Sequence, residues 1–337
     1  MLHHSVVTVP LAAALAMLYA RLVATFVGPG LGRLLFLTPV LALLLVLPLA
    51  APLYITRGTA AFFLAWLGEF KLLLASGRGP LDPGLRPVPF VFTATLPVKL
   101  LPGAAAGAEE KVSLPLLSSS IKVAIMVALL QVFRRRKDQM HPYATFALYG
   151  IYIYCFLDSL LPCLAALGRA LMGMGLEPQF DKPYLSTSLQ DFWGRRWNLM
   201  ASAVLRPAVY IPVRARLGAP AGVLATFLVS GLVHEVVVYY ITFRLPTGQL
   251  TAFFLLHGAS MCAERWWARR WPNASRLPRV VATPLVVLFV LATALWLFFP
   301  PLFGNGMDDR FIAEFNALSA ALVDAGGRLL RLAGIGR

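Results

Sequence analysis

Residues 34–53 read LLFLTPVLALLLVLPLAAPL, a run of twenty residues without one charged side chain. A helix needs about 20 apolar residues to cross the hydrocarbon core of a bilayer. The rest of the chain has the same character, because 59% of its 337 residues are hydrophobic and only 13% are charged. A soluble domain carries about 25% charged residues, so this composition excludes a soluble enzyme, a disordered chain and a coiled coil. The sequence predicts an all-α, multi-pass integral membrane protein.

Eight apolar runs are candidate membrane spans, and dividing the longest of them in two would make nine. These runs are Val6–Val27, Leu34–Leu53, Thr59–Ala75, Leu114–Phe133, Tyr143–Met172, Ala221–Phe243, Gln249–Ala263 and Val280–Phe303. We expect about eight or nine transmembrane helices in a single integral membrane domain over residues 1–337. The first run is too long for a signal peptide and no basic segment precedes it, so we expect a retained helix. Pro and Gly are frequent in Ser76–Ser113, where we expect an extended loop.

The chain is strongly basic, with 30 Lys and Arg against 15 Asp and Glu and a net charge of +15. These basic residues lie between apolar runs, where they orient a membrane protein and face anionic head groups or phosphorylated substrates. No basic amphipathic stripe is present, so we do not expect nucleic acid as a partner. Cys155, Cys163 and Cys262 match no metal or disulfide spacing, and we expect them to pack as small hydrophobic side chains without a metal.

Residues 188–198 read SLQDFWGRRWN and lie in the longest interval without a good span. In helical geometry Trp193 and Trp197 are four residues apart and would stack on one face. Three polar residues at steps of four and three would lie on a neighbouring face: Asp191, Arg195 and Asn198. An interfacial amphipathic helix, with Trp at the head groups and Arg reaching outward, explains the mixture of Trp and Arg. It explains the Asp, Asn and Gln residues less well, which leaves a functional site open.

Residues 228–240 read LVSGLVHEVVVYY and place His234 and Glu235 in the middle of an apolar span. Ionisable groups in the hydrocarbon are costly and persist mostly where they face a cavity or a partner. A hydrogen bond between helices is the structural alternative for His234. A zinc-protease motif is excluded, because His-Glu-x-x-His would need a histidine where Val238 stands. We expect the lone His257, on an apolar helix, to be a satisfied core histidine.

These two segments, in this order, resemble the membrane-bound O-acyltransferase superfamily. Members of that superfamily pair a segment of this Phe-Trp and Trp-Asn type, here Phe192-Trp193 and Trp197-Asn198 with three residues between them, with a buried His-Glu about one span later. The closer resemblance is to the plant wax synthase family and covers nearly the whole chain. It is carried by residues 61–73, 177–180, 183–198, 205–207, 229–235 and 296–300. Glu69 and Asp181 depart from the family, where we expect Asn, and this bears on substrate detail rather than reaction type.

The resemblance implies a membrane-bound O-acyltransferase fold with a buried catalytic chamber, and a wax synthase-like core at residues 173–265. It implies transfer of an acyl group from acyl-CoA, as co-substrate, to a long-chain fatty alcohol, which gives wax esters. No bound cofactor is implied, and the expected partners are acyl-CoA, a lipid alcohol and membrane lipids. Enzymes of this kind reside in the endoplasmic reticulum.

Roles for individual residues follow from the resemblance and are compatible with their chemistry. We expect His234 to be the catalytic base, because a buried neutral imidazole can accept a hydroxyl proton. Asn198 can donate a hydrogen bond to the developing oxyanion without adding a charge. The candidate acyl-CoA-binding residues are Arg195, Arg196, Trp193 and Trp197, within a cationic stretch from Lys182 to Arg216. The candidate supporting residues are Glu235 and Asp191.

Three alternatives stay open from the sequence. One is a non-catalytic member of the same fold that acts as a lipid-binding or scaffold protein, although the presence of both Asn198 and His234 argues against it. The acceptor could equally be a sterol or diacylglycerol, since each suits an apolar tunnel with one polar end. A proton-coupled transporter with His234 and Glu235 as its proton relay belongs to a different class. The transporter needs no Trp-Asn segment, and the sequence lacks the inverted repeat that would favour it.

Overall fold

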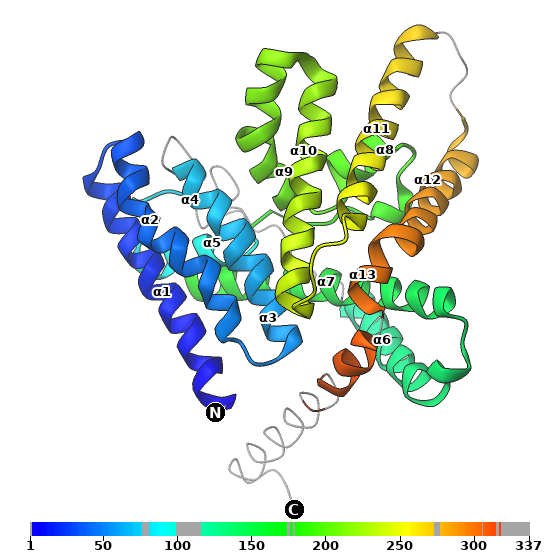
Figure 1. Cartoon of the computed structure of the whole chain (residues 1–337), viewed down its shortest axis with the longest axis horizontal. Helices are drawn as coiled ribbons and strands as arrows, with labels where there is room; N and C mark the ends of the chain where they lie inside the picture. The colour runs from blue at the N-terminus through cyan, green and yellow to red at the C-terminus, as the bar shows by residue number, and fades with distance from the viewer. Residues whose placement is uncertain are drawn as a thin grey trace, which may run out of the picture.

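The computed structural model describes residues 2–75, 81–98, 116–173, 176–177, 179–272, 277–304, 306–314 and 317. All elements in these ranges are helices, as predicted (Figure 1). Six helical stretches among the described residues are long and apolar enough to cross a membrane. They are Val7–Phe26, Leu31–Ala50, Tyr54–Ala75, Pro142–Ala170, Leu199–Thr242 and Arg279–Phe303. The protein is therefore an all-α, multi-pass membrane protein.

The N-terminal helices form one group, drawn from blue to cyan in Figure 1. They are α1 (Leu2–Phe26), α2 (Leu31–Val46) with the 3-10 turn η1 (Leu47–Ala50), α3 (Tyr54–Ala60), the π-helix η2 (Ala61–Gly68), α4 (Glu69–Ala75) and α5 (Pro87–Thr95). Their buried aliphatic side chains form one core between α1, α2, α4 and α5. The elements α3, η2 and α4 follow one another without a break and correspond to one predicted span.

The helix α5 lies inside the segment predicted to be an extended loop, so that prediction is wrong for Pro87–Thr95. A proline in the first turn of a helix is favourable, because its fixed φ suits the helix and its missing N–H is not needed there. The end of α5 is held by Lys71, whose Nζ donates to the carbonyls of Thr93 and Leu96 at 2.6 Å each. That contact comes from another helix and is invisible to local sequence patterns. The parts of the predicted loop at 76–80 and 99–113 lie outside the described residues.

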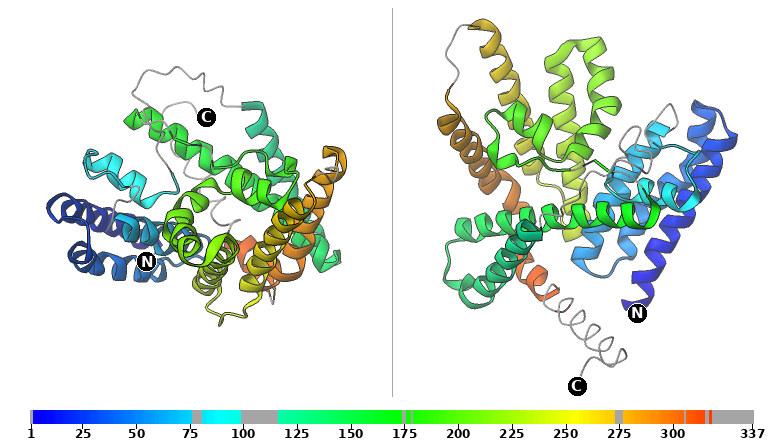
Figure 2. Two further views of the ribbon diagram at one scale, coloured as in Figure 1. Left: turned by 90° about the horizontal axis from the view of Figure 1, so that it is seen from above. Right: turned by 180° about the vertical axis from the view of Figure 1, so that it is seen from behind.

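The second group of long helices packs around a core rich in aromatic side chains. It consists of α6 (Leu116–Arg136), the 3-10 turn η3 (Lys137–Gln139), α7 (Pro142–Met172), α10 (Ile211–Thr242), α11 (Gln249–Arg270), α12 (Arg279–Thr293), the π-helix η7 (Ala294–Phe298) and α13 (Phe299–Phe303). The long predicted run Tyr143–Met172 is one continuous helix, α7. Figure 2 shows α7 crossing the molecule at a steep angle to α10, α11 and α12.

Short elements between α7 and α10 carry the SLQDFWGRRWN segment. They are the 3-10 turn η4 (Pro183–Leu185), α8 (Leu189–Asp191), the π-helix η5 (Phe192–Arg196), α9 (Leu199–Leu205) and the π-helix η6 (Arg206–Tyr210). A small buried cluster joins this region to the N-terminal group, because Trp66 and Leu67 of η2 pack with Met200 and Val204 of α9. The segment is thereby held between the two groups of helices.

Three helices have their first backbone N–H groups bound by a glutamate from a distant element. These are Glu314 at α3, Glu235 at α11 and Glu264 at α8. The N-terminus of a helix carries partial positive charge and unpaired N–H groups, so a carboxylate stabilises it. Glu314 and Glu264 therefore join segments that are far apart in the sequence, and Glu235 joins the consecutive helices α10 and α11.

Candidate active site

His234 lies near the middle of α10 with its imidazole in a fixed orientation. Its Nδ1 lies 2.7 Å from the carbonyl oxygen of Ser230, one turn earlier on the same helix. A carbonyl oxygen can only accept a hydrogen bond, so Nδ1 carries the proton in the neutral ring. The lone pair is consequently on Nε2, which has no hydrogen-bond partner within the described part of the chain. The structure thus presents Nε2 as a free base.

Aromatic rings surround the His234 imidazole. The ring centroids of Phe254, Trp66 and Phe298 lie 4.4, 5.4 and 5.9 Å from it. These rings come from α11, η2 and η7, so three parts of the chain build one apolar environment. Such surroundings disfavour a charged imidazolium and favour the neutral ring.

Glu235 points away from His234 and serves the packing of two helices. Its Oε1 accepts hydrogen bonds from the backbone N–H groups of Leu250 at 3.0 Å and Thr251 at 3.2 Å. These are among the first residues of α11, which begins after Gly248 without a capping side chain of its own. Glu235 therefore fixes the start of the helix that carries Phe254 and His257.

The SLQDFWGRRWN segment is not the single helix predicted from its spacing. It forms α8 and η5, after which Trp197 is extended and Asn198 is left-handed with φ 42° and ψ 65°. The Trp197 N–H bonds to the Phe192 carbonyl at 2.8 Å, five residues earlier, so the last turn is wide and the α-helical register is lost. Trp193 and Trp197 meet edge to face instead of stacking, and Trp197 stacks on Phe192 at 5.4 Å.

Asn198 is the capping residue of α9. Its Oδ1 accepts a hydrogen bond from the Ala201 N–H at 3.1 Å. Asparagine is one of the few residues other than glycine that tolerate the left-handed region, so the sequence suits this conformation. Because the amide oxygen is used in the cap, the NH2 group of Asn198 is the part of the side chain left to donate to another molecule.

Trp193 is held by a chain of hydrogen bonds through His257. The indole Nε1 of Trp193 donates to His257 Nδ1 at 3.0 Å, and His257 Nε2 lies 2.9 Å from the Thr293 hydroxyl. The hydroxyl in turn donates to the Phe289 carbonyl at 2.7 Å. Both ring nitrogens of the fully buried His257 are therefore satisfied. This confirms the prediction of a core histidine and shows that it positions Trp193.

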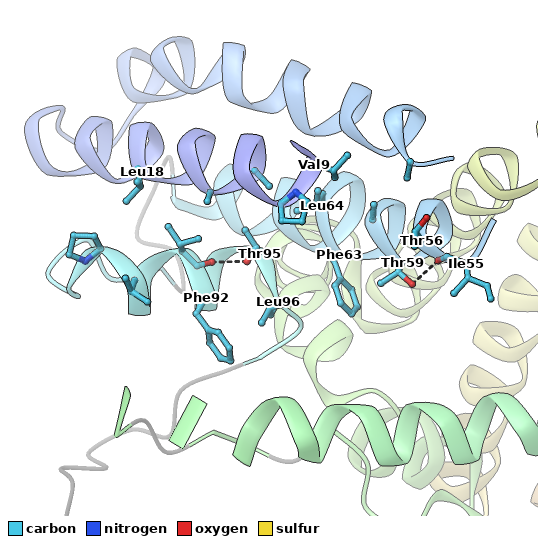
Figure 3. Close-up of a pocket in the computed structure, with 18 of the residues that line it drawn as sticks. Val9, Leu18, Ile55, Thr56, Thr59, Phe63, Leu64, Phe92, Thr95 and Leu96 are labelled. Atoms are coloured by element: carbon cyan, nitrogen blue, oxygen red, sulfur yellow. Dashed lines mark hydrogen bonds between the residues drawn. The ribbon is translucent and has the colours of Figure 1, made fainter. Parts of the chain in front are cut away.

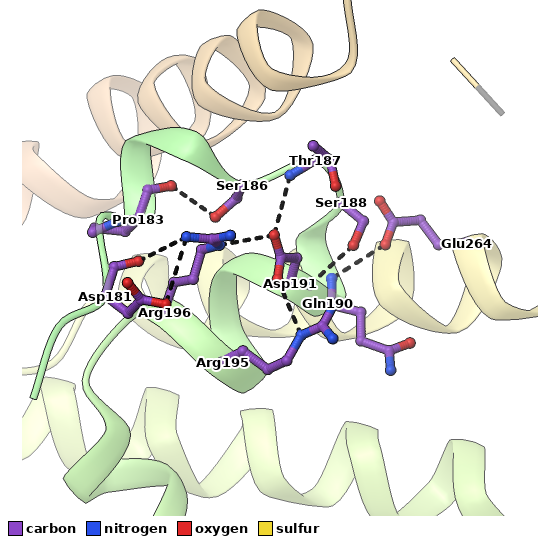
Figure 4. A network of polar contacts seen from close by, with 10 residues as sticks. All are labelled: Asp181, Pro183, Ser186, Thr187, Ser188, Gln190, Asp191, Arg195, Arg196 and Glu264. Atoms are coloured by element: carbon purple, nitrogen blue, oxygen red, sulfur yellow. Dashed lines mark hydrogen bonds and ion pairs between the residues drawn. The ribbon is translucent and has the colours of Figure 1, made fainter. Parts of the chain in front are cut away.

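Asp191 joins the two arginines that follow it (Figure 4). Its carboxyl oxygens lie 3.0 Å from Arg195 Nε and 2.9 Å from Arg196 Nε. Burial works to raise the pKa of Asp191, but hydrogen bonds from Arg196 and the Thr187 N–H, with the charge of Arg195, outweigh it. The pKa of this carboxyl is thus held below its usual value, and Asp191 stays ionised at neutral pH. Its role is to hold the segment together.

Glu264 of α11 anchors the same segment from outside. Its two carboxyl oxygens accept from the backbone N–H groups of Leu189 at 3.0 Å and Gln190 at 3.3 Å. Figure 4 shows Glu264 beside Gln190. Within the segment, the Ser188 hydroxyl accepts from the Asp191 N–H at 2.9 Å. The start of α8 is therefore fixed both locally and by α11. Sequence reasoning missed Glu264, because it lies outside the recognised motifs.

A cavity of about 310 Å³ brings several of the predicted site residues together. Four of them line it: His234, Asn198, Trp193 and Trp197. Four others do not: Arg195, Arg196, Asp191 and Glu235. The Arg195 side chain is 74% exposed, and the Arg196 guanidinium is engaged by Asp191 and by the Asp181 carbonyl at 3.0 Å.

Three other arginines line this cavity: Arg206, Arg214 and Arg265. Arg206 and Arg214 are exposed, so they lie where the cavity meets its surroundings, and Arg265 is half-buried. The first two fall within the cationic stretch already noted in the sequence. Trp66 lies in the segment 61–73 that carries the family resemblance, but nothing in the sequence places Trp66 or Arg265 at the site. The cavity therefore combines a free imidazole nitrogen, an amide and a cationic mouth.

Comparison with known proteins agrees with this arrangement. Residues 176–256, which include both segments, match the Membrane bound O-acyl transferase family. The chain is 39% identical to "Probable long-chain-alcohol O-fatty-acyltransferase 3" of Arabidopsis thaliana, over 90% of this chain and 91% of that protein. It is 38% identical to the long-chain-alcohol O-fatty-acyltransferase of Simmondsia chinensis, over 86% of each. It is 33% identical to acyl-CoA–sterol O-acyltransferase 1 of Arabidopsis thaliana, over 94% of this chain and 95% of that protein.

These similarities extend over nearly the whole chain and include both groups of helices. They favour acyl transfer over the transporter that the sequence alone left open. The chain belongs to the plant long-chain-alcohol O-fatty-acyltransferase, or wax synthase, family of membrane-bound O-acyltransferases.

Proposed function

We propose that this protein transfers a fatty acyl group from acyl-CoA to the hydroxyl of a long-chain alcohol and so produces a wax ester. One observation carries the proposal: His234, with its free Nε2, and Asn198 line the same cavity. The names of the relatives support the class of acceptor, since those of Arabidopsis thaliana and Simmondsia chinensis are called long-chain-alcohol O-fatty-acyltransferases. The cavity is then the catalytic chamber.

The reaction needs one base and one hydrogen-bond donor. The hydroxyl oxygen of the alcohol attacks the thioester carbonyl carbon while its proton passes to Nε2 of His234. The NH2 group of Asn198 donates to the oxygen that becomes negatively charged. The C–S bond then breaks, and the imidazolium returns the proton to the leaving thiolate, which departs as the thiol of coenzyme A. No covalent acyl-enzyme and no bound cofactor are needed, because both substrates meet in one chamber.

The head group of acyl-CoA carries phosphates, and guanidinium groups bind phosphate through paired hydrogen bonds. The arginines that line the cavity are therefore the best candidates for this contact, with Arg206 and Arg214 at its exposed mouth. Arg195 is exposed nearby on the same segment and stays a candidate for an outer phosphate contact. Arg196 is better explained as a structural residue, because Asp191 and Asp181 already engage it.

The whole chain, residues 1–337, is proposed to act as one integral membrane domain with residues 173–265 as its catalytic core. The helices α6 and α11 have 21 and 22 residues, enough to cross a bilayer as well. By length, these two helices and the six stretches described above would give eight spans, within the expected eight or nine. The endoplasmic reticulum is the proposed location, since it is where lipid-synthesising enzymes of this family are expected.

Expression in a yeast strain that lacks its neutral-lipid acyltransferases tests the proposal. Cells supplied with a long-chain alcohol should accumulate wax esters, seen by chromatography of extracted lipids. The variant His234→Ala at equal protein level is the control and should accumulate none. Steryl esters or triacylglycerol without wax esters would instead identify a sterol or diacylglycerol as the acceptor. Steryl esters are measured as well because the chain is 33% identical to a sterol O-acyltransferase.

A further inference from the structure

A second, larger cavity of about 720 Å³ lies within the N-terminal group of helices (Figure 3). Its walls come from α1, from α3 with η2, and from α5. It shares no lining residue with the His234 cavity, and η2 stands between the two. Phe63 and Leu64 of η2 line the N-terminal cavity, whereas Trp66 of the same helix lines the His234 cavity. The volume falls within the range of about 300–1,000 Å³ that is typical of small-molecule sites.

The walls of the N-terminal cavity offer almost no hydrogen bonds to a ligand. Three threonines line it, and each hydroxyl is bonded to a carbonyl of its own helix. Thr59 donates to the Ile55 carbonyl and Thr95 to the Val91 carbonyl, both at 2.8 Å. Figure 3 shows the bond between Thr59 and Ile55. Thr56 donates to the Leu53 carbonyl at 3.1 Å. What remains for a ligand is mainly methyl groups and aliphatic and aromatic side chains, which suit a hydrocarbon chain.

Among the residues that the structure describes, the lining of the same cavity offers no positive charge for a phosphate. None of these described lining residues is charged. Four cations on the surrounding helices instead donate to backbone carbonyls: Arg21, Arg33, Arg57 and Lys71. A buried anion without a partner is costly, so a phospholipid head group is disfavoured here.

We propose that the N-terminal cavity binds the hydrocarbon chain of one uncharged single-chain lipid, a long-chain alcohol whose hydroxyl stays outside these apolar walls, and that this site is separate from the acyl-transfer chamber. A chain of aromatic rings connects the two places. Phe62 lies 6.0 Å from Phe63 and 4.6 Å from Trp66 between ring centroids, and Trp66 lies 5.4 Å from His234. A lipid in the N-terminal cavity therefore lies one helix away from the catalytic imidazole. Binding at this site does not depend on acyl transfer.

Photo-labelling of the full-length protein in phosphatidylcholine nanodiscs tests the proposal. The probe is a C16 alcohol with a diazirine in its chain, and mass spectrometry locates the adducts. We expect adducts on α1, η2 and α5, and we expect excess hexadecanol to remove them. Adducts confined to outward-facing residues, or adducts that hexadecanol does not reduce, would overturn the proposal. Equal labelling of the same residues by a diazirine phospholipid would identify a membrane phospholipid as the occupant and would also overturn it.

Two variants narrow the cavity from different helices, Ala14→Phe on α1 and Ala60→Phe on α3. Each added ring displaces about two methylene groups of the bound chain, so labelling should fall by about tenfold. The matched control is Leu15→Phe, whose side chain is 59% exposed on α1 and which should leave labelling unchanged. Gel filtration after heating checks that each variant is folded. If both folded cavity variants are labelled like the control, the proposal is wrong.

The labelling is repeated in the His234→Ala variant to separate this site from the proposed acyl transfer. Labelling of the N-terminal cavity should be the same as in the wild type, although ester formation is lost. If the wild type forms no ester but the cavity is labelled, only the proposed acyl transfer fails. If esters form and no adduct is found in α1, η2 or α5, only the second lipid site fails.

Discussion

Replacement of Glu235 by alanine separates a structural role of this residue from a chemical one. The side chain is adjacent in sequence to His234, and its residue is only 5% exposed. Both hydrogen bonds that it accepts, from the N–H groups of Leu250 and Thr251, end on the same oxygen, Oε1. The variant Glu235→Ala removes both bonds. The variant Glu235→Gln retains an amide oxygen that can accept both of them and loses only the charge.

The size of the effect follows from these two bonds. A buried donor left without an acceptor costs about 1–3 kcal/mol, so the two orphaned N–H groups of Glu235→Ala cost about 2–6 kcal/mol. For Glu235→Gln the bonds persist but are no longer assisted by a charge, and the attraction to the start of α11 is lost. That change costs about 1–2 kcal/mol, the sum of a weaker pair of bonds and a lost helix-dipole contact. The alanine variant should therefore unfold at a clearly lower temperature than the glutamine variant.

Two measurements on each purified variant test this reasoning: the unfolding midpoint in detergent, followed by tryptophan fluorescence, and ester formation in nanodiscs. We expect the order wild type, Glu235→Gln, Glu235→Ala in the midpoint, and substantial activity in Glu235→Gln. The reasoning is refuted if Glu235→Ala unfolds at the wild-type temperature. It is also refuted if Glu235→Gln is as stable as the wild type but loses activity as fully as His234→Ala, because Glu235 would then take part in proton transfer.

Four further outcomes are expected. His234→Ala should lower turnover by about 10²-fold or more without a change in unfolding midpoint, and wild-type turnover by the folded variant would exclude His234 as the base. Asn198→Asp keeps an oxygen for the α9 cap but removes the amide donor. The maximal rate should therefore fall strongly, while the apparent affinity for acyl-CoA changes little. A weaker affinity at an unchanged maximal rate would make Asn198 a binding residue. Arg214→Gln should raise the acyl-CoA concentration at half-maximal rate about tenfold, in neutral and anionic nanodiscs alike. Arg195→Gln, at an arginine that does not line the cavity, should have a smaller effect. Equal effects would contradict the preference for the cavity-lining arginine as the acyl-CoA contact. The stabilisation that Asp191 provides should be complete above about pH 4 and should be lost as the pH falls through the lowered pKa of Asp191 in the folded protein. The unfolding midpoints of the wild type and Asp191→Asn should therefore converge in acid. A difference in midpoint that does not change with pH would contradict the ion pairs.

The sequence predicts the helices well because membrane spans are defined by length and composition, which are local properties. The predicted run Val280–Phe303 corresponds to the described stretch Arg279–Phe303, and Tyr143–Met172 corresponds to α7. The prediction failed where a tertiary contact decides the local structure. The helix α5 depends on Lys71 from α4, and no pattern in a loop rich in Pro and Gly indicates such a partner.

The candidate site was predictable to a different extent. The motif residues His234, Asn198, Trp193 and Trp197 line one cavity, although the helical geometry assumed for their segment is wrong. The π-type turn at η5 depends on a bond that skips one residue more than in an α-helix, and spacing rules based on 3.6 residues per turn cannot anticipate it. Arg265 and Trp66 join the cavity only through the folding of distant helices, so no local pattern points to them.

The glutamate at position 264 has a consequence for the order in which the protein is completed. The N–H groups of Leu189 and Gln190 find this acceptor 75 and 74 residues further along the chain. A ribosome synthesises the segment with Asn198 before it synthesises α11. Until α11 has been made, the N–H groups of Leu189 and Gln190 therefore lack the Glu264 carboxylate as their acceptor. Glu264 can reach α8 only after α11 has been synthesised, and Glu235 ties the start of α11 to α10 by accepting from the Leu250 and Thr251 N–H groups. The SLQDFWGRRWN segment therefore gains this anchor only after α11 has been made, and a chain that stops before residue 264 has all its predicted catalytic residues but not the contact that anchors the start of α8.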